Sequence, residues 1–357
     1  MKYENLVKKF IDNCDNFWND DFNIDLDSKH KKNLENFEKI YKNKINLFVR
    51  NLINWEGQTD LGAPWQISYE HLKKNGSLYT FINFLKSIKR KLTGFEFEKE
   101  VFFDDYEIIK LTKANQLLEK YPVHKFPLEK NFFFLNRKKK ISANYRWLRY
   151  IYLANKILSK NIIDNSSSWL DIGSYYGGIQ SIVKKELPNL KIILCDFNNQ
   201  LCRSYVNLYT QFPDCRHILP KEAVLIKKLS EIENGSIIYL PASNFKNIMN
   251  SEIDLLTNFF SFGEMKRNTF LNYFRELDKS QIKYVYLANR FVSSPFFEKT
   301  YDTDLNIFDY ISTKYKKIYF DVFPIHHYIM PKRTLFNRNN KRPMSSPYFE
   351  MLLKKND

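Results

Sequence analysis

The sequence predicts an α/β protein, in which a doubly wound, mostly parallel sheet of seven strands follows an N-terminal helical region. Before about residue 140, apolar residues recur at helical spacing. After it, apolar runs alternate with amphipathic segments, the pattern of parallel strands joined by crossover helices. The clearest unit is SSSWLDIGSYYGGIQSIVKKELPNLKIILCDF, residues 166–197. We therefore expect a mainly helical cap over residues 1–140 and the α/β domain over residues 141–357.

The expected elements follow from apolar periodicity and from turn residues. Helices are predicted at residues 6–18, 28–55, 78–92, 104–119, 144–159, 178–187, 199–211, 265–277 and 304–314. Strands are predicted at Ser168–Ile172, Lys191–Asp196, Ser236–Leu240, Asp254–Phe259, Lys283–Asn289, Lys317–Phe323 and Tyr348–Leu353. No helix is predicted before the last strand, so we expect an antiparallel strand to close one edge of the sheet.

Composition limits the classes of protein to consider. The net charge is +16, which suits anionic partners, although a basic composition spread over the surface is the favoured explanation. Nucleic-acid binding has only this charge in its favour, since no known binding motif is visible. No apolar run is long enough to span a membrane, which leaves peripheral membrane contact open. The N-terminus lacks a secretory signal, and the four cysteines form no CxxC pair, so we expect a cytoplasmic protein with reduced thiols.

The glycine turn after the first predicted strand indicates a ligand site. Asp171, Gly173 and Gly177 form a D-x-G-x-x-x-G pattern, in which glycine lets the backbone turn sharply and approach a ligand. Asp196 ends the next strand, where an acid accepts hydrogen bonds from the ribose hydroxyls of an adenosine group. Phe197 and Asn198 follow it, and Phe197 is placed to pack against the base.

Two adenosine ligands compete for this turn. A nicotinamide dinucleotide favours G-x-G-x-x-G, where the glycines make room for a pyrophosphate. Here Ser174 and Tyr175 stand where a pyrophosphate would leave no space for a side chain. S-adenosylmethionine has no phosphate, and its amino-acid end needs a carboxylate such as Asp171 and backbone donors such as those around Gly173. S-adenosylmethionine is therefore the predicted cofactor.

The motif LDIGSYYGG followed by LCDF resembles the first two motifs of class I S-adenosylmethionine-dependent methyltransferases. The later blocks IDLLTNFFSFGEMKRNTFLNYF, IKYVYLANR and SSPYFEMLL are similar to bacterial sugar O-methyltransferases found with polysaccharide genes. The resemblance covers residues 147–353 and implies a Rossmann-like methyltransferase sheet. Many such enzymes carry an acid after the third strand that contacts the adenine amino group. This chain has Ala242 and Ser243 there, so we expect adenine recognition to depend on backbone groups or on Ser243.

Methyl transfer to a sugar hydroxyl needs a group that takes its proton, either a general base or a metal ion. His326 and His327 follow a predicted strand and are candidates for the base, and Glu264 is a third candidate. Glu264 also completes a capping box with Ser261 at the start of a predicted helix. Asn258, near the end of the fourth strand, is expected to hold the cofactor or the acceptor. A metal requirement is left open.

Four more residues are candidates for the acceptor site. Asn289 and Arg290 end the fifth strand at the carboxyl edge of the sheet, and Arg290 suits a substrate phosphate. Arg149 is an alternative cation, unless it lies on a solvated helix face. Trp65 offers an aromatic face to a sugar, although Trp more commonly packs in a core.

The predicted function is O-methylation of a sugar hydroxyl, on a saccharide or a nucleotide-linked sugar, with S-adenosylmethionine as cofactor and S-adenosylhomocysteine as product. Two alternatives stay open. The positive charge favours an RNA methyltransferase, and Ala242 is the sole support for a catalytically inactive binding module. The oligomeric state is not predicted.

Overall fold

The computed structural model describes residues 2–18, 42, 45, 49, 104–122, 135–136, 139–140, 143, 145–265, 267–292, 305–325 and 348–356. The chain forms two compact units. The first, which we call the sheet unit, comprises Met1–Val49, Lys156–Phe323 and Ser346–Asp357, and the second comprises Arg50–Asn155 and Pro324–Ser345. The predicted division at residue 140 stays a prediction.

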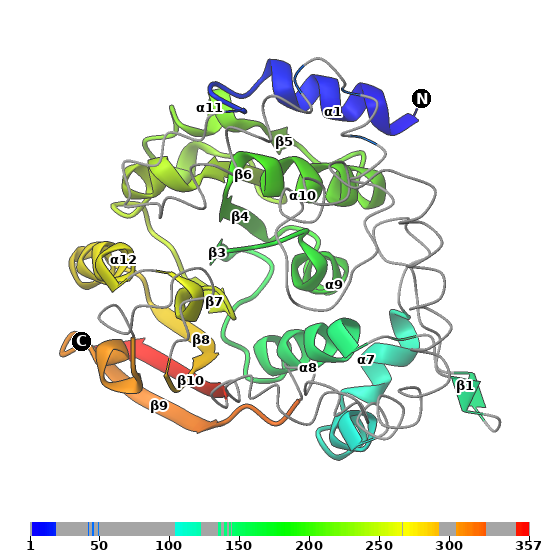
Figure 1. Ribbon diagram of the computed structural model, residues 1–357, viewed down its shortest axis with the longest axis vertical. Coiled ribbons are helices and arrows are strands. Elements are labelled where there is room, and N and C mark those ends of the chain that lie inside the picture. Colours follow the sequence, from blue (N-terminus) through cyan, green and yellow to red (C-terminus); the bar gives the residue numbers. More distant parts are fainter. Residues whose placement is uncertain are drawn as a thin grey trace, which may run out of the picture. The chain divides into compact units, whose positions relative to one another are not determined.

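The sheet unit is built on a sheet of eight strands (Figure 1). Its strands, in the order in which they lie side by side, are β5 (His217–Ile218), β6 (Ile237–Pro241), β4 (Lys191–Asp196), β3 (Ser168–Ile172), β7 (Leu255–Phe259), β8 (Tyr284–Arg290), β10 (Tyr348–Lys355) and β9 (Tyr315–Val322). All neighbours from β5 to β8 pair in parallel, whereas β10 pairs antiparallel with both β8 and β9. The predicted doubly wound α/β fold is confirmed.

Two expectations about this sheet were wrong. The sheet has eight strands rather than seven, because the two-residue strand β5 is too short to produce a periodic pattern. The antiparallel strand does not close the edge but lies between β8 and β9. Burial explains the order, since β10 is buried along its first six residues, while β9 is mostly exposed and suits an edge.

The strand order fixes where a ligand can bind. If β5 is left aside and the other strands are numbered along the chain from β3, their order across the sheet is 3-2-1-4-5-7-6. The order reverses between β3 and β7, and ligands of such sheets bind outside the carboxyl ends of the strands at that point. The ends of β3, β4, β7 and β8 therefore frame the candidate site.

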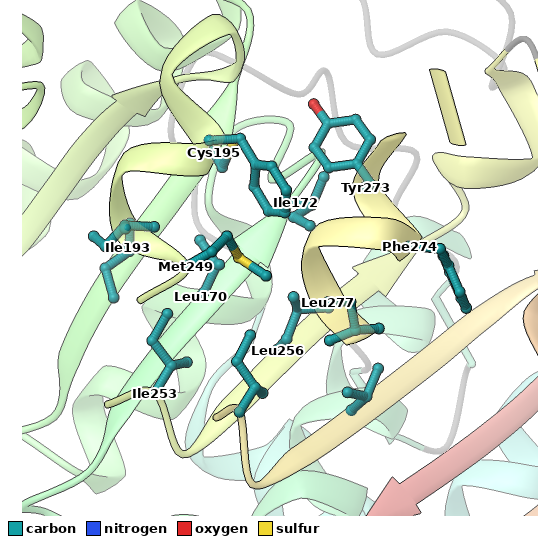
Figure 2. Packing of buried hydrophobic residues seen from close by; sticks show 14 of the residues in the cluster. Leu170, Ile172, Ile193, Cys195, Met249, Ile253, Leu256, Tyr273, Phe274 and Leu277 are labelled. Atoms are coloured by element: carbon teal, nitrogen blue, oxygen red, sulfur yellow. The ribbon is translucent and has the colours of Figure 1, made fainter. Parts of the chain in front are cut away.

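Helices cover both faces of the sheet. Figure 1 shows α9 (Gly178–Glu186) and α10 (Asn198–Gln211) on one side and α12 (Arg267–Lys279) on the other. Figure 2 shows the core on the α12 side, where α12 contributes the three labelled residues Tyr273, Phe274 and Leu277. They pack with strand residues such as Leu170, Ile172, Ile193, Cys195 and Leu256.

The first helix, α1 (Lys2–Asp12), belongs to the sheet unit. Phe10 is fully buried, and its ring centroid lies 5.7 Å from that of Tyr205 in α10 and 6.2 Å from that of Tyr239 in β6. The Lys221 N–H donates to the Asn13 carbonyl at 3.0 Å and ties the end of this helix to the short helix α11 (Pro220–Ala223). The N-terminus is therefore attached to the α/β core.

Two of the predicted helices differ from those in the structure. Residues 104–119 form a helix at 104–111 and a second, α7 (Asn115–Lys120), separated by a turn at Lys113 with φ of +59°. Within the described residues 305–314, the only helix is the short 3₁₀ helix η5 (Ile307–Tyr310), which begins at an Asn306 capping box. The buried residues Leu305, Tyr310 and Tyr315 are five apart, a spacing that does not place them on one face of an α-helix.

The remaining elements are short, apart from α8. They are η1 (Leu229–Glu231), η2 (Ala242–Ile248) and η3 (Phe262–Glu264), and the hairpin of β1 (Leu135–Asn136) and β2 (Lys139–Lys140). The helix α8 (Tyr145–Ser159) begins in the second unit and ends in the sheet unit. Within the described residues, no helix combines the length and the apolar character needed to cross a membrane.

Candidate active site

The turn between β3 and α9 has an unusual backbone. Gly173 and Gly177 have φ values of +77° and +76°, and Tyr175 between them has φ of +55°. The Gly173 N–H donates to the Cys195 carbonyl at 2.8 Å, and the Gly177 N–H donates to the Ser174 carbonyl at 3.0 Å. Left-handed backbone at three positions folds this segment into a compact turn at the carboxyl end of β3.

Both glycines are also required by close packing. A Cβ on Gly173 would lie 2.3 Å from the Ser261 Oγ, and one on Gly177 would lie 2.9 Å from the Leu208 Cδ1. The turn is therefore held between the loop after β7 and the helix α10. The sharp turn predicted from the two glycines is present, and the close approach that requires them here is to the side chains of Ser261 and Leu208.

Asp196 ends β4 directly beside this turn. Its Oδ2 accepts the Tyr175 N–H at 2.9 Å, and its Oδ1 accepts the Phe197 N–H at 2.7 Å. Each oxygen keeps a second acceptor position, and the side chain is partly exposed. Burial raises the pKa of this carboxyl to about 7, and the two N–H groups and the Arg203 guanidinium oppose part of the rise.

Asp171 lies deeper and is almost fully buried. Its Oδ1 accepts the Thr257 hydroxyl and its Oδ2 accepts the Gln180 Nε2, both at 2.5 Å. Burial raises its pKa to about 7 as well, against the effect of those two hydrogen bonds. Gln180 and Thr257 were not predicted, because nothing in the sequences of α9 and β7 distinguishes them from the other polar residues of these elements.

Asn258 and Asn289 form a buried network at the ends of β7 and β8. The Asn258 Nδ2 donates to the Ile172 carbonyl at 2.8 Å and to the Ser261 Oγ at 3.2 Å. The Asn258 Oδ1 accepts the Phe262 N–H at 2.9 Å and the Asn289 Nδ2 at 3.1 Å. These contacts hold the loop after β7 against the turn, so a direct contact from Asn258 to a ligand would replace one of them.

The predicted capping box at Ser261 does not form. Ser261 precedes the 3₁₀ helix η3, its side chain makes no capping hydrogen bond, and α12 begins only at Arg267. The hydroxyl instead accepts from Asn258, because the loop is folded back against Gly173. The Glu264 side chain lies outside the described part of the structure.

Arg290 lies at the carboxyl end of β8 in an aromatic setting. Its Nε donates to the Tyr348 hydroxyl at 2.6 Å, and its guanidinium lies 5.5 Å from the centroid of the same ring. The Phe260 ring lies 5.4 Å from that of Tyr348 and 5.2 Å from that of Phe323. Phe260 has φ of +66°, a strained conformation for a bulky residue that is enriched at functional sites.

The other predicted residues are placed as follows. Phe197 and Asn198 begin α10, Ala242 is buried at the start of η2, and the Ser243 hydroxyl donates to the Asn244 Oδ1 at 3.0 Å. Arg149 is buried in α8, so it does not lie on a solvated face, and it belongs to the second unit. Trp65, His326 and His327 lie outside the described residues. The structure thus brings together the turn, Asp171, Asp196, Asn258 and Asn289.

Polar atoms without partners mark this region. The Ser174 Oγ and both amide atoms of Asn199 are buried and have no hydrogen-bond partner within the described ranges. Buried polar groups are usually satisfied, so these atoms are available as hydrogen-bonding groups for a ligand at the turn. In the same ranges, no cluster of three His, Cys, Asp or Glu side chains is arranged to hold a metal ion.

Comparison with solved structures finds methyltransferases at low identity. A candidate sarcosine dimethylglycine methyltransferase from Galdieria sulphuraria is 14% identical over 58% of this chain and 85% of that one, with a TM-score of 0.40. An rRNA methylase from Streptococcus thermophilus is 12% identical over 58% and 96%, with a TM-score of 0.33. The methyltransferase domain of a bacterial Hen1 is 13% identical over 59% and 100%, with a TM-score of 0.36.

No family model matches the sequence, and no curated protein matches it. Because these likenesses are distant, the fold class rests on the strand order described above. The sheet unit has a Rossmann-like fold in which the antiparallel strand β10 lies between β8 and β9.

Proposed function

We propose that the protein is an S-adenosylmethionine-dependent methyltransferase. The observation that carries this proposal is the pairing of Asp196 with the glycine turn. The Asp196 carboxylate is fixed by two backbone N–H groups, one of which belongs to Tyr175 within the turn. An acid in this position suits two ribose hydroxyls, and the side chains of Ser174 and Tyr175 in the turn favour a cofactor without a pyrophosphate.

The chain's residues fit this cofactor. Asp196 would hold the ribose, Phe197 and Asn198 would lie beside the adenine, and Ala242 and Ser243 would border it. Gly173 and Ser174 would meet the amino-acid end, with Asp171 behind them. The unpartnered Ser174 Oγ is a donor of the kind that a carboxylate needs.

The cofactor supplies an activated methyl group and a neutral leaving group. The protein's residues must then align the acceptor and remove its proton. We propose His326, His327 and Glu264 as candidates for this base, as in the sequence analysis. Asn258 and Asn289 position the loop in which Glu264 lies. The Asn289 Nδ2 donates to the Asn258 Oδ1, and the Asn289 Oδ1 accepts the Gly263 N–H at 3.3 Å.

For the acceptor we propose a sugar hydroxyl, on a saccharide or nucleotide-linked sugar. The support is the resemblance of the sequence blocks around β7, β8 and β10 to bacterial sugar O-methyltransferases. Tyr348 pairs with Arg290 in the sheet, so the closing block begins at the same edge as the cofactor site. Arg290 is proposed to contact an anionic part of the acceptor, with Asn289, Arg149 and Trp65 as further candidates.

The test is calorimetric titration of the purified protein with S-adenosylhomocysteine. Asp196→Ala should weaken binding by roughly 100-fold, since it removes two hydrogen bonds to a charged group. Asp321→Asn on the exposed strand β9 is the matched control and should bind like the wild type. If the folded wild-type protein shows no binding, the cofactor proposal fails.

Methyl transfer to nucleotide sugars and to generic RNA then separates the acceptor classes. Transfer to a nucleotide sugar would support the proposed acceptor. Transfer to RNA alone, with the steep salt dependence typical of phosphate contacts, would overturn it.

A further inference from the structure

One face of α10 carries polar side chains that are buried. Arg203 is 1% exposed, Ser204 is fully buried and Asn207 is 3% exposed. Residues three and four apart on a helix share a face, so these side chains point in a common direction. Burial of polar groups is costly unless they find partners.

Their partners lie in the glycine turn. The Ser204 Oγ donates to the Tyr175 carbonyl at 2.7 Å, and the Asn207 Nδ2 donates to the Tyr176 carbonyl at 2.9 Å. The Arg203 guanidinium lies 5.2 Å from the centroid of the Tyr175 ring. Two successive carbonyls and one ring of the turn are thus held by a single helix face.

These contacts stabilise a backbone that Tyr175 would not adopt alone. A left-handed conformation costs a residue with a Cβ roughly 1–2 kcal/mol, and each net hydrogen bond contributes about 1 kcal/mol. In this conformation the Tyr175 N–H points to the Asp196 Oδ2 and donates to it. The Tyr175 carbonyl is held by Ser204 and its N–H by Asp196, so the helix face and the acid hold the two peptide units that flank Tyr175.

We propose that Ser204, Asn207 and Arg203 are positioning residues, which hold the β3–α9 turn in the conformation that binds the ligand. They act through Tyr175 and Asp196 and do not touch the ligand themselves. The identity of the ligand rests on the proposed function above. The positioning role rests on the contacts of the helix face alone.

The experiment compares Ser204→Ala and Asn207→Leu with Thr210→Val. Asn207→Leu keeps a side chain of similar size but loses the N–H donor and adds no charge. The Thr210 Oγ1 donates to the Val206 carbonyl at 2.7 Å within α10, so Thr210→Val removes a hydroxyl from the same helix without touching the turn. We measure affinity for S-adenosylhomocysteine by calorimetry from pH 5.5 to 8.5, unfolding in urea, and hydrogen exchange of the amides of residues 173–177.

Ser204→Ala and Asn207→Leu should each weaken binding by about tenfold, as expected for the loss of one positioning hydrogen bond. Because a loosened turn withdraws the Tyr175 N–H from Asp196, the midpoint of the pH dependence should also move to higher pH. The groups around Asp196 that bear on this midpoint are Asp171 from β3, Cys195 from β4, Arg203 from α10 and Tyr273 from α12. Thr210→Val should leave affinity and midpoint unchanged.

Equal affinity and an equal midpoint in both variants and the wild type would overturn the positioning role. So would a loss of affinity that merely follows the loss of stability in urea, as a packing role predicts. If the wild type does not bind S-adenosylhomocysteine at all, the proposed function fails, and hydrogen exchange still tests the positioning role. In that case exchange at the Tyr175 amide must be faster in Ser204→Ala than in Thr210→Val.

Discussion

Asp196 meets two demands that oppose each other. The proposed contact with two ribose hydroxyls favours a charged carboxylate, yet burial at the end of β4 disfavours the charge and raises the pKa of Asp196 to about 7. The backbone N–H groups of Phe197 and Tyr175 and the Arg203 guanidinium limit this rise. Under the proposed function, protonation of Asp196 near neutral pH would therefore weaken ribose binding.

A pH dependence of binding follows. The carboxylate form accepts both hydroxyls, so affinity for S-adenosylhomocysteine should fall by up to about tenfold per pH unit below pH 7 and level off above it. Asp196→Asn should bind more weakly and lose most of this pH dependence. The remaining pH dependence should come from Asp171, whose pKa is also about 7. Calorimetry at four pH values between 5.5 and 8.5 measures both curves. A wild-type affinity that stays constant over this range contradicts the prediction.

At the residue level, the sequence identifies some of the site and misses the rest. Asp171, Asp196 and the two glycines could be found, because they stand at the ends of strongly apolar strands with fixed spacing. Gln180 and Thr257, which hold Asp171, could not, since their role depends on which face of α9 and β7 meets β3. The buried polar face of α10 was likewise hidden, because its partners are carbonyl groups, which the sequence does not reveal.

The glycine turn is the element on which β3, α9 and α10 converge. Gly177 has φ of +76°, and a Cβ there would lie 2.9 Å from the Leu208 Cδ1. Gly177→Ala should therefore lower the free energy of unfolding by roughly 2–4 kcal/mol, from backbone strain together with overpacking.

A double mutant cycle separates these two causes. Leu208→Ala makes room for the added methyl group, so the double variant should be more stable than the sum of the single changes predicts, by about 1 kcal/mol or more. Backbone strain at residue 177 should remain. Urea unfolding of the four proteins gives the coupling energy, and strict additivity would show that Leu208 does not limit the space at Gly177.

Elements with many buried residues were predicted well, and short ones were not. The β3, β4, β7 and β8 strands were located to within a residue or two, because each is a run of buried apolar side chains. The two-residue strand β5 and the turn at Lys113 leave no periodic signal. Asp304–Lys314 failed as a helix since its buried residues are spaced for a loop with one 3₁₀ turn.

At the scale of the whole molecule, both ends of the chain belong to one compact unit. The unit contains Met1–Val49 as well as the last strand, β10. Beneath α1, the His217 Nδ1 lies 2.9 Å from the Tyr239 hydroxyl, and burial lowers the pKa of this imidazole to about 4. The neutral histidine and its aromatic neighbours form the surface on which α1 packs.

The packing of α1 should therefore contribute to the stability of the α/β core. Phe10 is fully buried against Tyr205 and Tyr239, so Phe10→Ala should lower the free energy of unfolding by about 3–5 kcal/mol. Phe308→Ala is the matched control, because Phe308 is 76% exposed and its loss should change stability by less than about 0.5 kcal/mol. Urea unfolding followed by far-UV circular dichroism measures both. An unchanged transition in Phe10→Ala would mean that the sheet unit is stable without α1, and that the N-terminal helix is an accessory to the fold.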